Sequence, residues 1–373
     1  MMTDKTGIYI HVPFCLSKCH YCDFCSRTRV DDQIKNLYAK RLCEEIRAFG
    51  AGIEKRPTAD TVYFGGGTPT LLSPEQFSLI LDTVNEVFGI DDGAEITAET
   101  NPKSADHSKL RDMRSVGINR LSIGMQSVHD NELKALGRIH RFSDFADTYL
   151  DARRAGFNNV SVDLMYGIPE QNIESFRRSV ETLAVAHPEH ISSYCLTVED
   201  GTNFGKRRDS LVLPDEDAVS EMYIMMTEML RAYGYEKYEI SNFAHNGQVS
   251  RHNLKYWKRE DYIGFGPAAH SFWGGVRFAN SRDVEGYLEG KDIREYSEKI
   301  EGADAADEYV MLGMRLRSGI DIEEFNRLFN IDFMEHYGNV FKRFAPEYIS
   351  IDDKRCAFTD KGMFVSNYIL SET

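Results

Sequence analysis

The sequence predicts an α/β protein, with a partial (β/α)6 barrel of the TIM type followed by a small α+β module that resembles a winged helix. Three observations predict this fold. From residue 8 to about residue 200, short β-branched runs alternate with amphipathic stretches of about 20 residues. Polar residues follow the ends of these runs, as they do at the functional rim of a barrel. The alternation stops after Tyr233, and a helical pattern replaces it from Ala305.

Six short runs predict parallel strands, at residues 8–12, 61–64, 95–99, 120–124, 160–164 and 191–196. Between the first two runs, a helix is predicted by one apolar stripe, formed by Ile34, Leu37, Leu42, Ile46 and Phe49. Another helix is predicted to begin at Pro74, because Ser73 can cap it and proline suits the first helical position. Repeated strand–helix units of this kind favour parallel strands that curve into a full or partial barrel.

Residues that can do chemistry recur at the predicted carboxyl ends of the strands. They are a cysteine cluster, residues 65–69 (GGGTP), Glu99 and Asn101, Gln126, and Asp163. Because the functional groups of a barrel gather at this end of its strands, we expect these residues to share one rim.

Three units are predicted along the chain. Residues 1–234 form the barrel, and residues 235–300, rich in aromatic residues and glycine, close or cap its open side. Residues 301–373 form the small module, with helices and a hairpin near residues 349–359. The module is acidic, so a packing or partner role is favoured over DNA binding; its acidic residues include Asp321, Glu323, Glu324, Asp352 and Asp353.

The composition indicates a cytoplasmic protein that does not bind nucleic acid. The formal net charge is −15, whereas binding to phosphates needs a basic face. The N-terminal residues lack a basic segment followed by a long apolar run, and no later stretch has the ~20 apolar residues of a membrane span. Four of the seven cysteines lie between Cys15 and Cys25, a crowding that favours a metal site over disulfides.

The spacing of Cys15, Cys19 and Cys22 predicts a [4Fe-4S] cluster. Three thiolates in one short loop can hold three irons of the cluster and leave the fourth without a protein ligand. A zinc site is the simpler alternative, but such sites usually combine two separated pairs, and no second C-x2-C pair follows.

This loop resembles the signature of the radical SAM superfamily. Its form YIHVPFCLSKCHYCDF, together with FGGGTPT and DLMYGIP, is similar to the branch that contains oxygen-independent coproporphyrinogen III oxidase and the HemW haem chaperones. The resemblance covers nearly the whole chain. It implies that the amino and carboxylate groups of S-adenosylmethionine (SAM) chelate the open iron, and that an electron from the cluster can cleave the sulfonium to a 5'-deoxyadenosyl radical.

The resemblance also implies residues for SAM binding. These are Tyr9 near the cluster, Tyr21 at the adenine, Gly66, Gly67 and Thr68 at the methionine amino group, Glu99 and Arg138 at the methionine end, and Gln126 and Asp163 at the ribose hydroxyls. Each has a simpler explanation: the glycines a tight turn, Glu99 a helix cap, Arg138 a solvated charge. Asp163 is harder to explain that way, because a carboxylate in an apolar strand is costly without a partner.

Two features argue against the oxidase within this branch. Phe24 stands where the oxidase family has a cysteine two residues after the third ligand, and only 14 residues precede Cys15, fewer than the extension that the oxidase uses. Cys25 departs from both patterns; we interpret it as a buried bystander rather than an extra thiol.

The motif H-N-x-x-Y-W favours the chaperone. Its residues His252, Asn253, Tyr256 and Trp257 match a motif associated with haem binding, in which the imidazole would ligate iron and the aromatic rings would stack on the porphyrin. The alternative is a folded loop in which His252 and Asn253 bond to backbone groups. His270 and His11 are weaker candidates for the ligand.

The sequence therefore predicts a haem chaperone that binds haem, transfers it to acceptor proteins, which could be respiratory and membrane-associated, and carries SAM on its cluster. A homodimer is compatible with this function. The runner-up is oxygen-independent coproporphyrinogen III oxidase. A third hypothesis is a radical SAM enzyme with another substrate, suggested by Cys25. The sequence leaves open whether SAM is cleaved.

Overall fold

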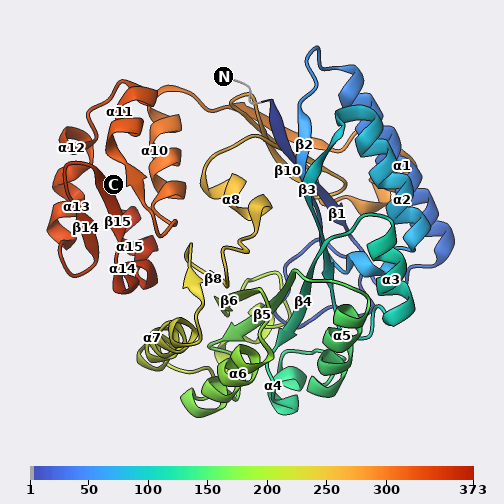
Figure 1. Cartoon of the computed structure of the whole chain (residues 1–373), viewed down its shortest axis with the longest axis horizontal. Coiled ribbons are helices and arrows are strands. Elements are labelled where there is room, and N and C mark those ends of the chain that lie inside the picture. The colour runs from blue at the N-terminus through green and yellow to red at the C-terminus, as the bar shows by residue number, and fades with distance from the viewer. Residues whose placement is uncertain (1–3) are drawn as a thin grey trace.

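One curved sheet dominates the computed structural model, which describes residues 4–373 (Figure 1). It has 12 strands in the order β12-β11-β10-β9-β1-β2-β3-β4-β5-β6-β8-β7. Its middle consists of parallel strands, β1 (Lys5–Val12), β2 (Thr58–Gly66), β3 (Ile90–Thr100), β4 (Arg120–Gln126), β5 (Val160–Tyr166) and β6 (His190–Cys195). All six predicted strands are present with somewhat different bounds. The outermost strands do not pair with each other, which confirms a partial barrel.

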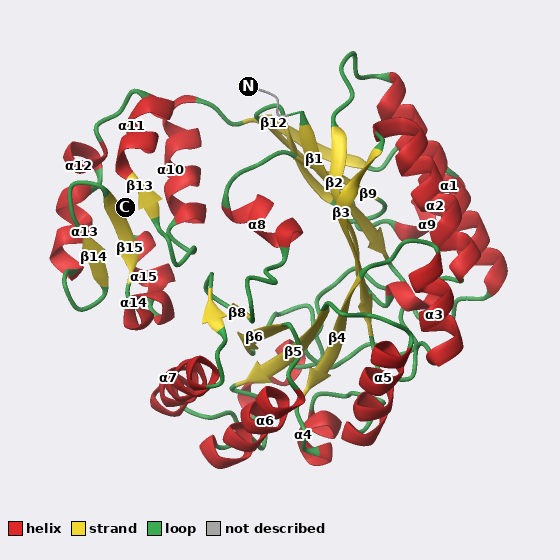
Figure 2. Ribbon diagram, viewed as in Figure 1, coloured by secondary structure: helices red, strands yellow, loops and turns green. Residues whose placement is uncertain are grey.

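Helices cover the outer, convex face of the sheet (Figure 2). They are α1 (Asp32–Ala51), α2 (Pro74–Phe88), α3 (His107–Ser115), α4 (Asp130–Ala135), α5 (Phe142–Arg154), α6 (Ile173–Ala186) and α7 (Glu216–Ala232), with 3-10 turns at η1 (Pro69–Leu71) and η2 (Gly205–Ser210). As predicted, Ser73 caps α2, in a reciprocal pair of hydrogen bonds with Gln76.

The predicted apolar stripe of α1 is wrong at one position. Leu37 is 39% exposed, while Leu42 and Ile46 are fully buried. Five residues on a helix correspond to about 500°, so Leu37 and Leu42 point in directions about 140° apart. Tyr38 is buried in place of Leu37, and its hydroxyl donates a hydrogen bond to the carbonyl of His11.

Residues 235–300 extend both edges of the sheet. Strands β7 (Glu236–Lys237) and β8 (Asn242–Ala244) lie beside β6, whereas β9 (Tyr262–Phe265) pairs in parallel with β1. Strands β10 (His270–Trp273), β11 (Val276–Asn280) and β12 (Arg294–Lys299) follow, with helix α9 (Val284–Glu289) between the last two. The short helix α8 (Arg251–Trp257) lies inside the arc of strands (Figure 1).

The remaining residues form a small module across the open side of the arc (Figure 1). Its helices are α10 (Gly302–Gly313), α11 (Ile322–Phe329), α12 (Phe333–His336), α13 (Gly338–Phe344), α14 (Asp360–Phe364) and α15 (Ser366–Leu370). Its sheet has the order β13-β15-β14, from Ile320–Asp321, Arg355–Phe358 and Ile349–Ile351. The helices and the hairpin follow the predicted order, and Asp360 joins the module to the barrel by pairing with Arg231 of α7.

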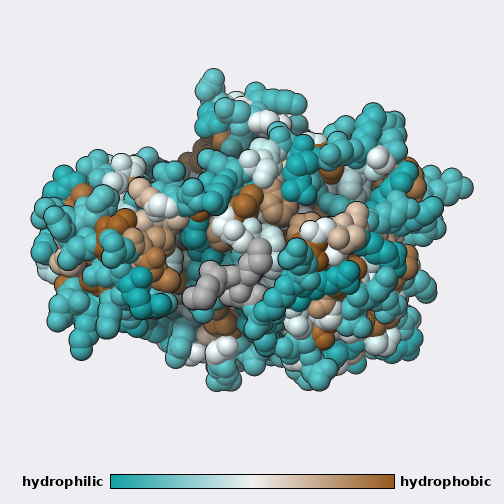
Figure 3. Space-filling view, turned by 90° about the horizontal axis from the view of Figure 1, so that it is seen from above, coloured by the Kyte–Doolittle hydropathy of each residue, from teal (hydrophilic) through white to brown (hydrophobic). Residues whose placement is uncertain are grey.

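The strands present polar side chains to the space inside the arc. On β4, Leu121, Ile123 and Met125 are buried among the apolar residues of the core. The alternate positions, Arg120, Ser122, Gly124 and Gln126, line an internal cavity. The outer surface is mainly hydrophilic in the view of Figure 3, with hydrophobic side chains in small groups. Within residues 4–373, no helix has the length and apolar character needed to cross a bilayer.

Candidate functional site

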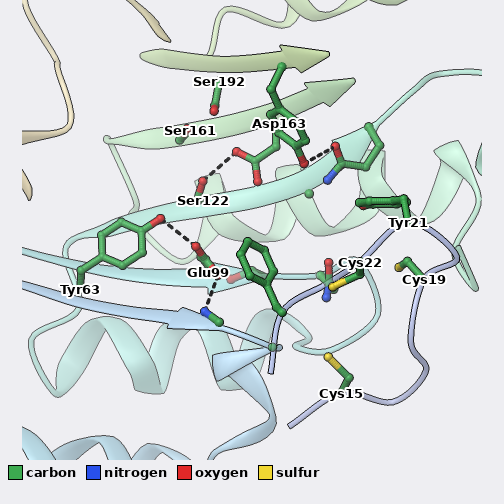
Figure 4. Close-up of a pocket in the computed structure, with 18 of the residues that line it drawn as sticks. Cys15, Cys19, Tyr21, Cys22, Tyr63, Glu99, Ser122, Ser161, Asp163 and Ser192 are labelled. Carbon is green, nitrogen blue, oxygen red and sulfur yellow. Dashed lines mark hydrogen bonds between the residues drawn. The ribbon is translucent and has the colours of Figure 1, made fainter. Parts of the chain in front are cut away.

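A cavity of about 360 Å³ lies inside the curved sheet, and most of the predicted site residues line it (Figure 4). They are Tyr9, Cys15, Cys19, Tyr21, Cys22, Gly66, Gly67, Glu99, Gln126, Arg138, Asp163, Asn253 and Tyr256. Three predicted residues do not line it: Thr68 and Trp257 line two other pockets, and His252 is hydrogen-bonded to Tyr256, which lines the cavity. The structure thus brings the ends of β1 to β5 together at one rim.

The three cysteines of the predicted cluster loop follow β1 and gather at one side of the cavity (Figure 4). Two groups reach their sulfurs: the Thr68 hydroxyl lies 3.7 Å from Sγ of Cys15, and Nη1 of Arg138 lies 3.5 Å from Sγ of Cys19. Burial raises the pKa of the Cys15 thiol, and it raises the pKa of the Cys22 thiol to about 11. A metal at this position would therefore favour the thiolate forms.

The three thiols of the loop can serve as ligands of an iron–sulfur cluster. Within residues 4–373, no three His, Cys, Asp or Glu side chains converge closely enough to hold one metal ion. In a cubane each thiolate binds a different iron, so its ligands lie further apart. With three cysteines present, such a cluster would keep one iron open to a chelating ligand.

The glycine run packs directly against the cysteine loop. The amide of Gly67 donates to the carbonyl of Val12 at 2.9 Å, and the amide of Thr68 donates to the carbonyl of Phe14 at 2.6 Å. A Cβ on Gly67 would lie 2.5 Å from the Phe14 carbonyl oxygen. Gly66 has a φ of +105°, and a Cβ there would lie 2.6 Å from the His11 ring. Only glycine fits this close approach, which fixes the start of the cysteine loop.

Glu99 is a partly buried carboxylate without a cationic partner. Its oxygens accept hydrogen bonds from the Tyr63 hydroxyl and the Gly66 amide, both at 3.0 Å. Burial and then the nearby Asp163 carboxylate raise the pKa of Glu99 to about 8. No lysine, arginine or histidine of the described chain forms an ion pair with it. A ligand cation, such as the ammonium group of SAM, would supply that partner.

Arg138 forms hydrogen bonds with residues of the rim and does not pair with Glu99. Its Nη2 donates to Oδ1 of Asn101 at 2.7 Å and to the carbonyl of Gly124 at 2.8 Å. Asn101 in turn donates to the Thr68 hydroxyl at 2.8 Å. Arg138 and Glu99 share the cavity wall, but they form no ion pair with each other. Arg138 thus links the ends of β3 and β4 to the cysteine loop.

The two residues predicted at the ribose have partners that the sequence did not indicate. Asp163 accepts a hydrogen bond from Ser122 at 3.0 Å, and Gln126 accepts one from the Tyr194 hydroxyl at 3.1 Å. Burial raises the pKa of Asp163. Gln126 has a φ of +68°, a conformation that is costly for a residue other than glycine and is often found at functional sites.

In the H-N-x-x-Y-W motif, both ring nitrogens of His252 are hydrogen-bonded. His252 is 1% exposed, its Nδ1 shares a hydrogen bond with the Thr61 hydroxyl at 2.7 Å, and its Nε2 shares one with Tyr256 at 2.8 Å. Burial and then the charge of Lys255 lower the pKa of His252 to about 3. The amides of Arg251 and His252 both donate to the Glu95 carboxylate at 3.1 Å.

Two other residues of the motif, Asn253 and Trp257, have polar side-chain atoms without a hydrogen-bond partner in the described chain. The side chain of Asn253 lines the cavity, and Nε1 of Trp257 is buried without a hydrogen-bond partner within the described chain. Of the other candidate ligands, His11 has both ring nitrogens engaged, with the Tyr9 hydroxyl and the Cys25 carbonyl. His270 is exposed and makes only a 3.4 Å contact through Nδ1, with Tyr296.

The residues present fit a SAM-bound iron–sulfur cluster. The three thiols match the cluster. Glu99, which has no cationic partner in the described chain, and the partly buried Asp163 suit a cationic ligand with ribose hydroxyls. When bound, the cluster would supply an electron to the sulfonium of SAM. The chain's own residues would bind and orient that ligand.

The comparisons with known proteins agree with this site. The model of the radical SAM superfamily matches residues 9–183, and the model of the HemN C-terminal domain matches residues 300–365. The solved structure of coproporphyrinogen III oxidase (HemN) from Escherichia coli has the same fold, with a TM-score of 0.85 at 21% identity over 98% of this chain and 89% of that one. The chain therefore belongs to the radical SAM superfamily, which implies SAM and a [4Fe-4S] cluster as cofactors.

Curated relatives define the family more closely. The heme chaperone HemW of Bacillus subtilis (strain 168) is 33% identical over 97% of both chains, and that of Escherichia coli (strain K12) is 35% identical over 86% of this chain and 85% of its own. The mitochondrial radical S-adenosyl methionine domain-containing protein 1 of Danio rerio is 30% identical over 98% of this chain and 86% of its own. Within the superfamily, the chain belongs to the HemW family.

Proposed function

We propose that this chain is a haem chaperone, which binds haem, passes it to acceptor proteins and carries a SAM-bound [4Fe-4S] cluster on Cys15, Cys19 and Cys22. One observation carries the proposal: relatives named heme chaperone HemW match 97–100% of the chain, so they span both the cluster-bearing barrel and the C-terminal module. We place the activity in the cytoplasm, since all seven cysteines are free, as suits a reducing compartment.

In this proposal His252 is the axial ligand, and Asn253, Tyr256 and Trp257 complete the haem site. Iron ligation requires a change of conformation, because both ring nitrogens of His252 are already hydrogen-bonded. Ligation through Nε2 requires the Tyr256 hydroxyl to move away from that nitrogen. Its low pKa supports the role, since only a neutral imidazole can ligate iron.

A haem titration tests both the function and the ligand. Haem is added to the full-length protein, to His252→Ala and to His270→Ala, and the Soret band is followed. We expect a shifted Soret band for wild type and His270→Ala, and its loss for His252→Ala. Far-ultraviolet circular dichroism checks that the variants fold. Unchanged binding by a folded His252→Ala would remove the assigned ligand, and no binding by any form would reject the chaperone function.

The oxidase is the second candidate, because the fold matches that of HemN. Phe24, which replaces the expected cysteine, is 63% exposed beside the cluster loop, so no thiol is available at that position. An anaerobic assay with reduced cluster, SAM and coproporphyrinogen III separates the two functions. Clean conversion to protoporphyrinogen IX would overturn the chaperone proposal.

A further inference from the structure

The inner wall of the barrel contains an arginine without a hydrogen-bond partner. Arg120 is the first residue of β4, lines the cavity and is 1% exposed. Its Nε is buried with no partner, and no described residue accepts a hydrogen bond from its terminal nitrogens or forms an ion pair with it. A buried charge left in this state is strongly unfavourable, so such a group needs an explanation.

No carboxylate of the described residues forms a direct ion pair with Arg120. Burial, and then the charge of Arg120, lower the pKa of His190, so this neighbour is neutral. Asp163 feels the charge of Arg120, but its carboxylate is hydrogen-bonded to Ser122 instead. The guanidinium therefore faces an internal cavity with its donors free.

Neutral polar side chains line the same part of the cavity. Ser122, Ser161 and Ser192 lie on the adjacent strands β4, β5 and β6, apart from the three cysteines (Figure 4). The side chains of Ser192 and Asn253 make no hydrogen bond within residues 4–373. Interiors of such barrels are usually filled by bulky apolar residues, so this polar lining is unusual. We call Arg120, Ser122, Ser161, Ser192 and Asn253 the inner-wall subsite.

The inner-wall subsite is deeper than the SAM residues of the rim. Arg120 begins β4 and Gln126 ends it, so roughly 20 Å of strand separate their backbones at about 3.3 Å per residue. Both residues line the same cavity. The cavity therefore extends well below the rim.

We infer that the inner-wall subsite binds a small monocarboxylate, whose carboxylate group accepts hydrogen bonds from the guanidinium of Arg120. The planar fork of arginine matches a carboxylate, and Ser192 and Asn253 supply further neutral donors, because Ser122 and Ser161 are already bonded to Asp163 and His190. A single anionic charge suits the site, because one guanidinium, that of Arg120, matches one carboxylate group. The inference does not depend on haem binding.

The test is thermal unfolding of the anaerobically reconstituted full chain with sodium formate, acetate or propionate. Sodium chloride at equal ionic strength and acetamide are the ligand controls. The variants are Arg120→Gln and the charge-matched Arg111→Gln, at a residue with a 62% exposed side chain. We expect at least one of the three carboxylates to raise the midpoint of wild type and Arg111→Gln by on the order of 1–2 °C, and to leave Arg120→Gln unchanged.

Two further readouts separate a ligand site from a structural role. Without carboxylate, Arg120→Gln is expected to unfold no earlier than wild type, since it loses an unpaired buried charge. Its affinity for SAM is expected to stay within about twofold of wild type. The inference is overturned if Arg120→Gln responds to carboxylates as wild type does, if acetamide or chloride acts equally, or if none of the three carboxylates shifts wild type. A lower midpoint without ligand, or a parallel loss of SAM binding, also overturns it.

Discussion

The hydroxyl of Tyr256 lies 2.8 Å from Nε2 of His252, and this hydrogen bond occupies the ring nitrogen that would ligate haem iron. The two residues are four positions apart in α8, so the helix itself brings them together. Tyr256 therefore competes with haem for His252.

Replacing Tyr256 with phenylalanine should strengthen haem binding. The variant keeps the ring but removes the competing hydrogen bond, whose net contribution is about 1 kcal/mol, or roughly fivefold in affinity. Titration followed by the Soret band measures the change. Tyr296→Phe, next to the exposed His270, is the matched control and should change nothing. Equal or weaker binding by Tyr256→Phe would argue against ligation through Nε2 of His252.

SAM binding should depend on pH through Glu99. The pKa of Glu99 in the free protein is about 8, and a bound cation stabilises the ionised carboxylate. Binding therefore releases a proton, and affinity should rise with pH up to about 8. In Glu99→Gln the affinity should be lower and this rise absent. Calorimetry in buffers of different ionisation enthalpy counts the protons, and Glu99→Gln corrects for the titration of SAM itself.

The same shift has a consequence for the stability of the free protein. The pKa of Glu99 is higher in the folded state than its ordinary value of 4.5, so the folded state holds the proton more tightly. Its contribution to stability is thus fully present below pH 4.5 and is lost as the pH rises to about 8. Between these values, the free energy of unfolding of wild type should fall relative to that of Glu99→Gln. Urea unfolding at a series of pH values measures this difference, and parallel curves would contradict the assignment.

The rim could be predicted from the sequence because its residues stand at the ends of recognisable strands. Glu99 and Asp163 lie inside β-branched runs, and the cysteine loop directly follows one. Their hydrogen-bond partners could not be predicted in the same way. Tyr63 reaches Glu99 only because β2 and β3 pair with Tyr63 opposite Thr97, and this register follows from tertiary packing.

The pairing of strands at the edges of the sheet also could not be predicted from the sequence. Residues 235–300 were predicted to close or cap the open side of the barrel, but the sequence did not indicate how they join the sheet. Strand β9 pairs with β1, more than 250 residues earlier in the chain. No local pattern specifies such a distant pairing. The pair His252 and Tyr256 did have a signal, since residues four apart on a helix share a face.

Serine substitutions at the three cluster ligands should lower the iron content, whereas a serine substitution at Cys25 should not. Serine at Cys15, Cys19 or Cys22 removes a thiolate, so the content after anaerobic reconstitution should fall well below about four irons per chain. Cys25→Ser should keep full iron and sulfide, because Cys25 is buried and its Sγ contacts the carbonyl of Arg282, 3.4 Å away. Electron paramagnetic resonance of the reduced cluster should change on adding SAM in wild type and in Cys25→Ser. Loss of the cluster in Cys25→Ser would make that thiol a fourth ligand.

Gly67→Ala should damage the cluster site through packing alone. The new Cβ would lie 2.5 Å from the Phe14 carbonyl oxygen, so the backbone at the start of the cysteine loop must move. Such overpacking typically costs about 1–3 kcal/mol, and the displaced loop should hold less iron after reconstitution. Gly93→Ala is the matched control, because its nearest contact would be 3.5 Å away, at an exposed position. Urea unfolding and iron content should both fall for Gly67→Ala and stay near wild type for Gly93→Ala. If Gly67→Ala kept wild-type stability and iron, close packing of the glycine run would not be what positions the cysteine loop.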